Sequence, residues 1–117
     1  SCTPATYPVS ILTIHGTEDA TIPYEGATFF EETYPGALET IDRFATLAGC
    51  GSSSELDNID VDESIDGAET AVLSYTDCTP DTDVTLWTIV GGPHIPVPWV
   101  ESAQDSFVDW LLDHTRL

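Results

Sequence analysis

Two side chains in the sequence, Asp19 and His94, have the types and positions needed for acid–base chemistry. Asp19 lies in the polar turn formed by residues 15–19, directly after a short apolar run. His94 follows Gly91-Gly92-Pro93 at the end of another apolar run. A histidine can take the proton of a serine hydroxyl, while a carboxylate fixes the imidazole tautomer and stabilises the imidazolium that forms. One interpretation of the pair is the acid and base of nucleophilic catalysis. The other is that Asp19 is a structural residue whose carboxylate accepts from nearby N–H groups in an Asx-turn.

Each of these side chains follows a segment that is typical of a buried β-strand. Residues 8–14 are apolar and rich in β-branched side chains, and residues 84–90 form a similar run that ends at Gly91. A third strand is predicted over residues 71–75. Because functional residues of open α/β sheets gather where strands end, we expect Asp19 and His94 to lie close together.

Two amphipathic helices are expected to cover this sheet. The first carries apolar residues at helical spacing and ends at Gly49 or Gly51. Its apolar stripe consists of Leu38, Ile41, Phe44, Ala45, Leu47 and Ala48. The second runs from Ser102, its expected N-cap, to Thr115. Its stripe consists of Phe107, Trp110, Leu111 and His114.

The order of these elements is strand, helix, strand, strand, helix. The polar, acidic segment from Ser52 to Gly67 is expected to be a surface loop between them. Alternating elements with buried strands predict an α/β fold in which helices cover the faces of the sheet. The length of 117 residues predicts a single domain over residues 1–117.

The charge balance restricts the classes of partner. The chain has 21 acidic residues against two arginines and has no lysine, which gives a formal net charge of -19. Nucleic-acid binding needs basic side chains to displace counterions, so we expect no nucleic-acid partner. No apolar run approaches the ~20 residues of a membrane helix, so no membrane span is expected. The negative charge also argues against an anionic membrane surface as a partner. Molar salt screens the repulsion among so many carboxylates, which favours a saline environment over the alternative of an acidic but otherwise ordinary secreted protein.

Three cysteines, Cys2, Cys50 and Cys78, are present. Their spacings fit no zinc pattern such as Cys-x-x-Cys, so no metal site is expected from them. An odd number in an exported chain suggests one disulfide and one cysteine left over.

Several motifs, taken together, resemble the C-terminal part of the secreted polyhydroxybutyrate depolymerases and the related feruloyl and acetylxylan esterases. The segment PVSILTIHGTEDATIPYEG at 8–26 resembles the acid-bearing segment of that family. The helix that ends in LAGCG at 47–51, and YTDC at 75–78, resemble the segments that supply a cysteine pair. The strand and loop LWTIVGGPH at 86–94 resemble the family's tryptophan-containing strand and glycine-rich histidine loop. The motifs cover essentially the whole chain in the family's order.

The resemblance implies a fold, an activity and a set of site residues. The fold would be the C-terminal portion of an α/β-hydrolase, with about three strands and two main helices. Asp19 would be the triad acid, His94 the triad base, and Cys50 and Cys78 a disulfide pair. The activity would be hydrolysis of a carboxylic ester, in a polyester or an acylated polysaccharide, by a secreted serine esterase. No cofactor is implied.

One departure from the family concerns the nucleophile. No Gly-x-Ser-x-Gly motif occurs in the chain, and the stretch GCGSS at 49–53 follows a helix, whereas a nucleophile elbow follows a strand. In the family's order the serine and the oxyanion hole would precede Ser1, so we expect a nucleophile-bearing segment upstream. The isolated chain is then expected to be nearly inactive, because without the nucleophile it has no covalent route through an acyl-serine. Pro93 also stands where a third glycine is common, which is expected to shift the loop that carries His94.

Several alternatives stay open. Tyr24 and Trp99 could form an aromatic substrate-binding wall, or could simply pack in the core. His15 and His114 are expected to be structural. The chain could instead be an inactive remnant that self-associates through an exposed sheet edge, so that its partner is a second copy. The acidic loop from Asp57 to Asp66 could also make it a cation-binding module, although its spacing is not that of an EF-hand.

Overall fold

The computed structural model describes residues 7–114. Along the chain these residues form β1 (Ile11–Gly16), β2 (Gly26–Phe29), β3 (Glu32–Pro35), α1 (Ala37–Leu47), β4 (Ser52–Ile59), β5 (Thr70–Thr76), β6 (Val84–Ile89) and α2 (Glu101–Asp113). One sheet has the strand order β1-β6-β5-β4, and β2 and β3 form a separate hairpin. In the larger sheet β1 and β6 run parallel, while β5 pairs antiparallel with both β6 and β4.

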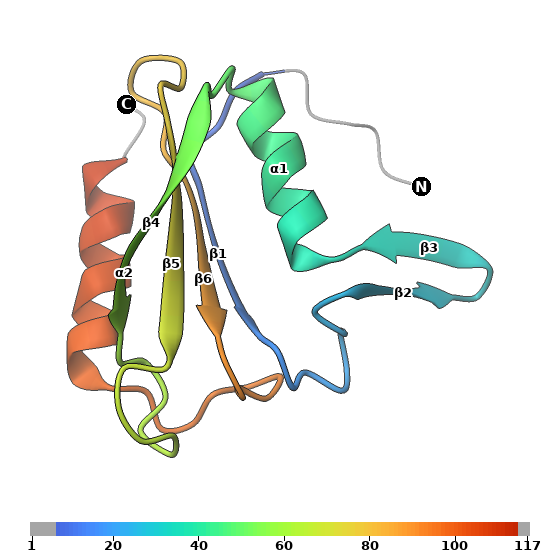
Figure 1. The fold of residues 1–117 in the computed structure, drawn as a ribbon, viewed down its shortest axis with the longest axis vertical. Coiled ribbons are helices and arrows are strands. Elements are labelled where there is room, and N and C mark those ends of the chain that lie inside the picture. Colours follow the sequence, from blue (N-terminus) through green and yellow to red (C-terminus); the bar gives the residue numbers. More distant parts are fainter. Residues whose placement is uncertain (1–6, 115–117) are drawn as a thin grey trace.

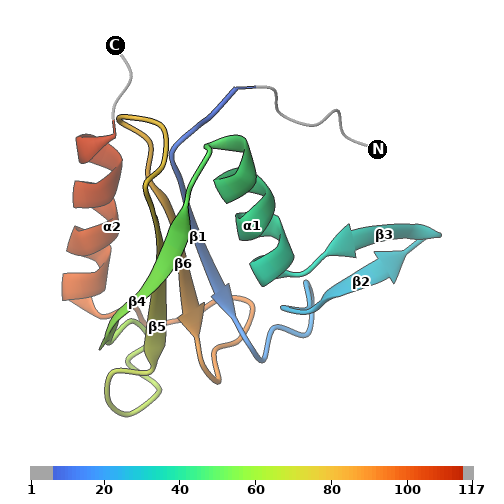
Figure 2. The same ribbon diagram turned by 45° about the horizontal axis from the view of Figure 1, so that its top comes forward.

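The two helices lie on opposite faces of this mixed sheet (Figure 1). The prediction of an α/β domain with helices on the faces of its sheet is therefore confirmed. The hairpin projects away from the sheet beyond the start of α1, as the turned view also shows (Figure 2).

The alternation of side chains along β6 explains how one sheet holds two cores. Val84 and Leu86 face α1, where they pack with Ile41. Trp87 and Ile89 belong to the core on the other face, which includes Ala103 of α2. Successive side chains of a strand point to opposite faces, so a strand that is covered on both sides is apolar almost throughout. Full burial of a side chain such as Leu86 stabilises the fold by about 2 kcal/mol.

The segment 52–59 forms strand β4, so the prediction of a loop there is wrong. It pairs antiparallel with β5, from Ser52 opposite Thr76 to Ile59 opposite Thr70. Its side chains are almost all exposed, as expected for a surface segment. Because β4 is an edge strand, the hydrogen bonds of its backbone hold it in the sheet without help from an apolar face.

The helix ends agree in part with the sequence. α1 ends at Leu47 and is followed by Gly49 at φ +70°, as the glycine predicted. α2 begins at Glu101 with Val100 as its N-cap and no side-chain cap, so the assignment of Ser102 as the cap is wrong. Leu111 is exposed, which is a second correction, since it was expected on the buried stripe. Thr115 lies outside the described residues.

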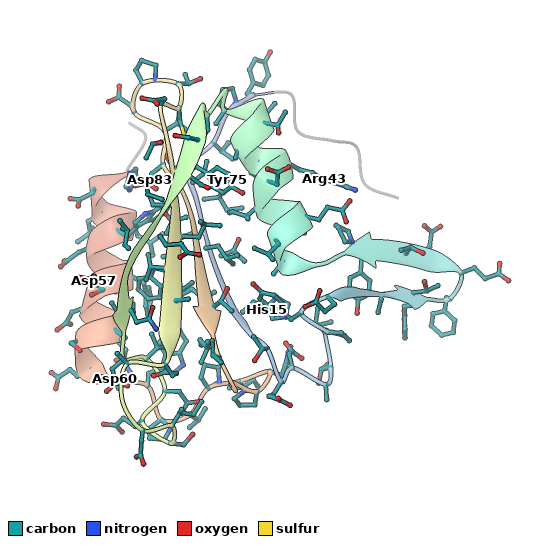
Figure 3. All side chains as sticks on the ribbon, viewed as in Figure 1. His15, Arg43, Asp57, Asp60, Tyr75 and Asp83 are labelled. Carbon is teal, nitrogen blue, oxygen red and sulfur yellow. A yellow bond between two sulfur atoms is a disulfide. The ribbon has the colours of Figure 1, made fainter. Side chains whose placement is uncertain are left out.

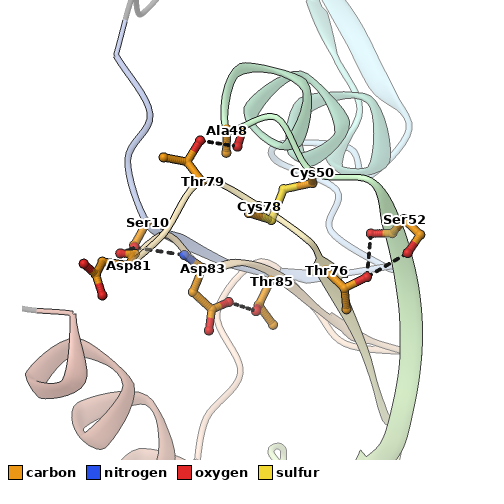
Figure 4. Close-up of a disulfide and its surroundings, with 10 residues drawn as sticks. All are labelled: Ser10, Ala48, Cys50, Ser52, Thr76, Cys78, Thr79, Asp81, Asp83 and Thr85. Carbon is orange, nitrogen blue, oxygen red and sulfur yellow. Dashed lines mark hydrogen bonds between the residues drawn. A yellow bond between two sulfur atoms is a disulfide. The ribbon is translucent and has the colours of Figure 1, made fainter.

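A disulfide joins Cys50, just after α1, to Cys78, just after β5 (Figure 4). Beside it, the backbone N–H and the hydroxyl of Thr79 both donate to the carbonyl oxygen of Ala48. These contacts fasten the end of α1 to the sheet. The pairing implied by the family resemblance is confirmed, whereas Cys2 lies outside the described residues.

Neither helix among residues 7–114 has the length and apolar character needed to cross a membrane.

Candidate functional site

The parallel pairing of β1 with β6 brings the candidate acid and base to one end of the sheet. The register places Gly16 opposite Ile89, so the turns that follow the two strands lie next to each other. Asp19 is in the turn after β1 and His94 is in the turn after β6. The predicted meeting of strand ends therefore has a direct geometric basis in this sheet.

Backbone contacts join these two turns. The N–H of Thr17 donates to the carbonyl of Ile89 at 3.0 Å, and the N–H of Glu18 donates to the carbonyl of Gly92 at 2.9 Å. The Gly91 N–H donates to the Thr17 hydroxyl at 2.8 Å. These three hydrogen bonds fix the positions of the acid turn and the histidine turn relative to each other, independently of the Asp19 and His94 side chains.

Asp19 and His94 form a direct hydrogen bond. His94 Nδ1 lies 2.8 Å from Asp19 Oδ2, and the bond forms with Pro93 in place. The other carboxylate oxygen, Oδ1, accepts from the backbone N–H groups of Thr21 at 2.9 Å and Ile22 at 2.7 Å. The Asp19 side chain is 4% exposed, whereas that of His94 is 44% exposed. The carboxylate is thus a fixed, buried anchor for an accessible imidazole.

The ionisation of Asp19 determines the tautomer of His94. Burial by itself would raise the pKa of Asp19, but the hydrogen bond from His94 and those from Ile22 and Thr21 outweigh it and lower the pKa to about 2. At neutral pH the carboxylate can therefore only accept, so His94 Nδ1 carries the hydrogen. The lone pair of a neutral His94 is then on Nε2, to which no group among residues 7–114 is hydrogen-bonded. An imidazole in this state can act as a general base.

His15 supports the acid turn. Its Nε2 donates to the carbonyl of Ile22 at 2.7 Å and lies 3.3 Å from Asp19 Oδ2. Figure 3 shows it toward the lower end of β1, the end from which the turn leaves the sheet. Because Nε2 carries the hydrogen in this bond, the lone pair of a neutral His15 is on Nδ1 and not on the nitrogen that lies next to Asp19. This arrangement fits the structural role expected for His15.

A hollow of about 290 Å³ adjoins the pair. Its walls are mostly apolar and include Ile22, Pro96 and Trp99 beside His15, Asp19 and His94. No serine or cysteine is among the described residues that line it. Ser52 and the serines after it lie on β4, at the opposite edge of the sheet from β1. The site as described therefore has an acid, a base and a hollow but no nucleophile.

The two aromatic residues expected to form a binding wall are in different places. Trp99 lines the hollow and packs edge-on against Phe107 at 5.5 Å between ring centres. Tyr24 is buried in the core on the α1 side, and its hydroxyl lies 2.7 Å from that of Thr88. Of the two alternatives for Tyr24, its burial at 8% exposure favours packing in the core over contact with a substrate.

Among residues 7–114, no group of three or more histidine, cysteine or acidic side chains is arranged to hold a metal ion. The acidic segment expected to form a loop instead contributes β4 and the turn that leads to β5.

Comparisons of the chain with models of protein families, with curated proteins and with solved structures find no match. The resemblance to the esterase family thus stays a prediction.

Proposed function

We propose that this chain carries the acid and base of a serine carboxylic ester hydrolase, as the C-terminal portion of an α/β-hydrolase similar to polyhydroxybutyrate depolymerases and feruloyl esterases. The single observation that carries the proposal is the hydrogen bond of 2.8 Å between His94 and the buried Asp19. The accessible Nε2 of His94 and the adjoining hollow support it.

In the proposed reaction a serine hydroxyl lies against Nε2 of His94. As the serine oxygen attacks the ester carbonyl, its proton passes to Nε2, and Asp19 stabilises the imidazolium. The imidazolium then gives this proton to the leaving alcohol, which leaves an acyl-enzyme. A water molecule, activated by the same His94, hydrolyses the acyl-enzyme. The apolar walls at Ile22, Pro96 and Trp99 suit the uncharged part of an ester of a polyester or an acylated polysaccharide.

The serine is proposed to come from a segment outside the 117 residues. Within residues 7–114, β1 pairs only with β6, which leaves one edge of an apolar strand unpaired. Its residues from Ile11 to His15 are only half-buried, although a strand of this composition is usually covered on both sides. The unpaired edge suits a further parallel strand that would bring a nucleophile close to His94.

The disulfide also bears on where the proposed enzyme works. A bridge such as Cys50–Cys78 persists in an oxidising environment, which supports a secreted protein. The net charge of -19 supports an environment rich in salt.

Fluorophosphonate labelling at high salt, read by intact mass, tests the proposal. The 117-residue chain alone is expected to take no label, while a longer chain that includes the upstream segment is expected to take one label per molecule and to lose it in H94A. Labelling of a serine within the 117 residues would contradict an external nucleophile. Unchanged labelling of H94A in the longer chain would contradict the role of His94.

The unpaired edge of β1 also favours a second candidate, an inactive remnant that self-associates. Two exposed side chains, Phe29 and Phe30 at the hairpin tip, add apolar surface. The molar mass of the purified chain, measured by light scattering, distinguishes the self-associating remnant from the esterase. A stable monomer would contradict self-association, and an oligomer that takes no label even with the upstream segment would favour it over the esterase.

A further inference from the structure

The loop that carries His94 is held through a buried acidic residue, Glu69, which precedes β5. Glu69 is 9% exposed, and its Oε1 accepts three hydrogen bonds. The donors are the N–H of Val61 at 3.1 Å, the N–H of Asp62 at 2.8 Å and the hydroxyl of Thr70 at 2.9 Å. Although burial raises the pKa of Glu69, these bonds lower it, so the side chain is an anion held by neutral donors.

The groups that Glu69 holds are in turn bonded to the far end of the His94 loop. The carbonyl of Val61 accepts from the N–H of Val100 at 2.7 Å. Asp62 forms a β-bridge with Trp99, and the N–H of Glu63 donates to the carbonyl of Pro98 at 3.0 Å. The side chain of Glu69 therefore fixes the short strand-like segment against which residues 98–100 lie.

The main chain of Glu69 holds the near end of the same loop. Its carbonyl accepts from the N–H of Val90 at 3.3 Å, directly after β6. The segment from Val90 to Val100 thus has both ends tied to one residue, with His94 between them. His94 itself makes only one side-chain hydrogen bond among residues 7–114, to Asp19. Its loop is held at these two ends as well as by the bonds of Gly91 and Gly92 to the acid turn.

We propose that Glu69 is a positioning residue that holds the His94 loop so that the imidazole meets Asp19. This inference deepens the proposed function, on which its catalytic meaning rests. The contacts of Glu69 do not themselves depend on that function, so they can be tested without any turnover.

The contacts of Glu69 with Val61, Asp62 and Val90, here called the Glu69 clamp, can be changed without removing Glu69 by a substitution at the neighbouring Asp60. Glu69 Oε2 is buried and has no hydrogen-bond partner among the described residues. Burial raises the pKa of Asp60, and so do the charge of Glu69, a side-chain hydrogen bond with Glu69 and the charges of Glu63 and Asp62. An amide at position 60 can donate to the Glu69 carboxylate and carries no charge that repels it, so D60N is expected to strengthen the contacts through which Glu69 holds the loop.

The first test reads the tautomer of His94 by long-range ¹H–¹⁵N spectra of the imidazoles at neutral pH. The wild type is expected to carry its hydrogen on Nδ1 of His94. E69A is expected to shift His94 to the Nε2–H form that free imidazoles favour, while His15 keeps its own signals. E69Q retains an acceptor oxygen and is expected to restore the wild-type spectrum. A folded E69A with unchanged His94 signals would overturn the proposal, and so would an equal change at His15.

The second test does not need a truncated side chain and remains decisive if E69A fails to fold. Amide hydrogen exchange is compared between D60N and D57N, which removes the same charge from exposed β4. D60N is expected to slow exchange of the Asp62 and Val100 N–H groups about tenfold, the effect of one hydrogen bond to a charged group. D57N is expected to leave both groups unchanged. Equal rates at Asp62 and Val100 in the two variants would overturn the clamp.

Discussion

The backbone of Gly16 lies against that of Gly92, so closely that a methyl group on Gly16 would overlap the carbonyl oxygen of Gly92. This contact lets the acid turn and the histidine turn come together. G16A is therefore expected to lower the free energy of unfolding by about 1–3 kcal/mol and to weaken the Asp19–His94 bond. Urea denaturation measures the first effect and imidazole spectra the second.

A matched control for this substitution is G51A. A methyl group at Gly51 would meet nothing closer than the Asp77 Cβ at 3.3 Å, well away from the site. It is expected to change stability little and to leave the imidazole of His94 unchanged. Equal effects of the two substitutions would show that the contact of Gly16 with Gly92 has no special role.

The lowered pKa of Asp19 predicts a dependence of stability on pH. In the unfolded chain an aspartate titrates near ~3.9, whereas in the fold Asp19 has a pKa of about 2. Its ionised form therefore stabilises the fold fully above the unfolded pKa, and the contribution is lost as the pH falls from about 4 to about 2. The difference in unfolding free energy between wild type and D19N is expected to shrink over this range. A difference that stays constant down to pH ~2 would contradict a carboxylate held by hydrogen bonds.

The disulfide is expected to stabilise the chain mainly through its unfolded state. Cys50 and Cys78 are separated by 28 residues, and closing a loop of that size stabilises by roughly 3–4 kcal/mol in the chain-entropy model. The double variant C50S/C78S should unfold at correspondingly lower urea concentration. If a reducing agent destabilises this variant as much as the wild type, the effect has another source.

The excess of acidic residues predicts that salt stabilises the fold. The net charge of -19 is spread over a small domain, so that carboxylates repel one another at low ionic strength. Raising the salt to molar concentration shortens the Debye length to ~3 Å and is expected to raise the melting temperature. A melting temperature that falls with added salt would contradict adaptation to a saline environment.

The parts of the fold that could be predicted from the sequence are those with a clear period. The apolar runs that became β1 and β6, and the stripe through Ile41 and Ala45, each follow the spacing of their element. The meeting of Asp19 with His94 followed from the position of each after a strand. A local pattern is enough for such elements because burial on a face selects it.

Other features depend on contacts that no local pattern encodes. β4 has polar side chains because it is an edge strand, and only its pairing with β5 makes it a strand. The β2–β3 hairpin turns at Phe30 and Glu31, both at positive φ, without the glycine or asparagine that usually signals such a turn. The role of Glu69 arises from bonds to a segment that precedes it and a loop that follows it. The sequence carries no signal for this role, because Glu69 differs from the other acidic residues only in being buried, and its burial is visible only in the structure.

The central claim is that Asp19 holds His94 as a base with its lone pair on Nε2, and an activated ester tests it most directly. With p-nitrophenyl acetate, Nε2 can attack the carbonyl itself and release p-nitrophenolate, after which water converts the acetyl-imidazolium to acetate and frees the imidazole. The purified chain is expected to hydrolyse this ester slowly, at a rate above that of buffer alone. H94A is expected to fall to the buffer rate. H114Q, which removes an imidazole at the end of α2, is expected to keep the rate of the wild type. Equal rates for the wild type and H94A would contradict the account.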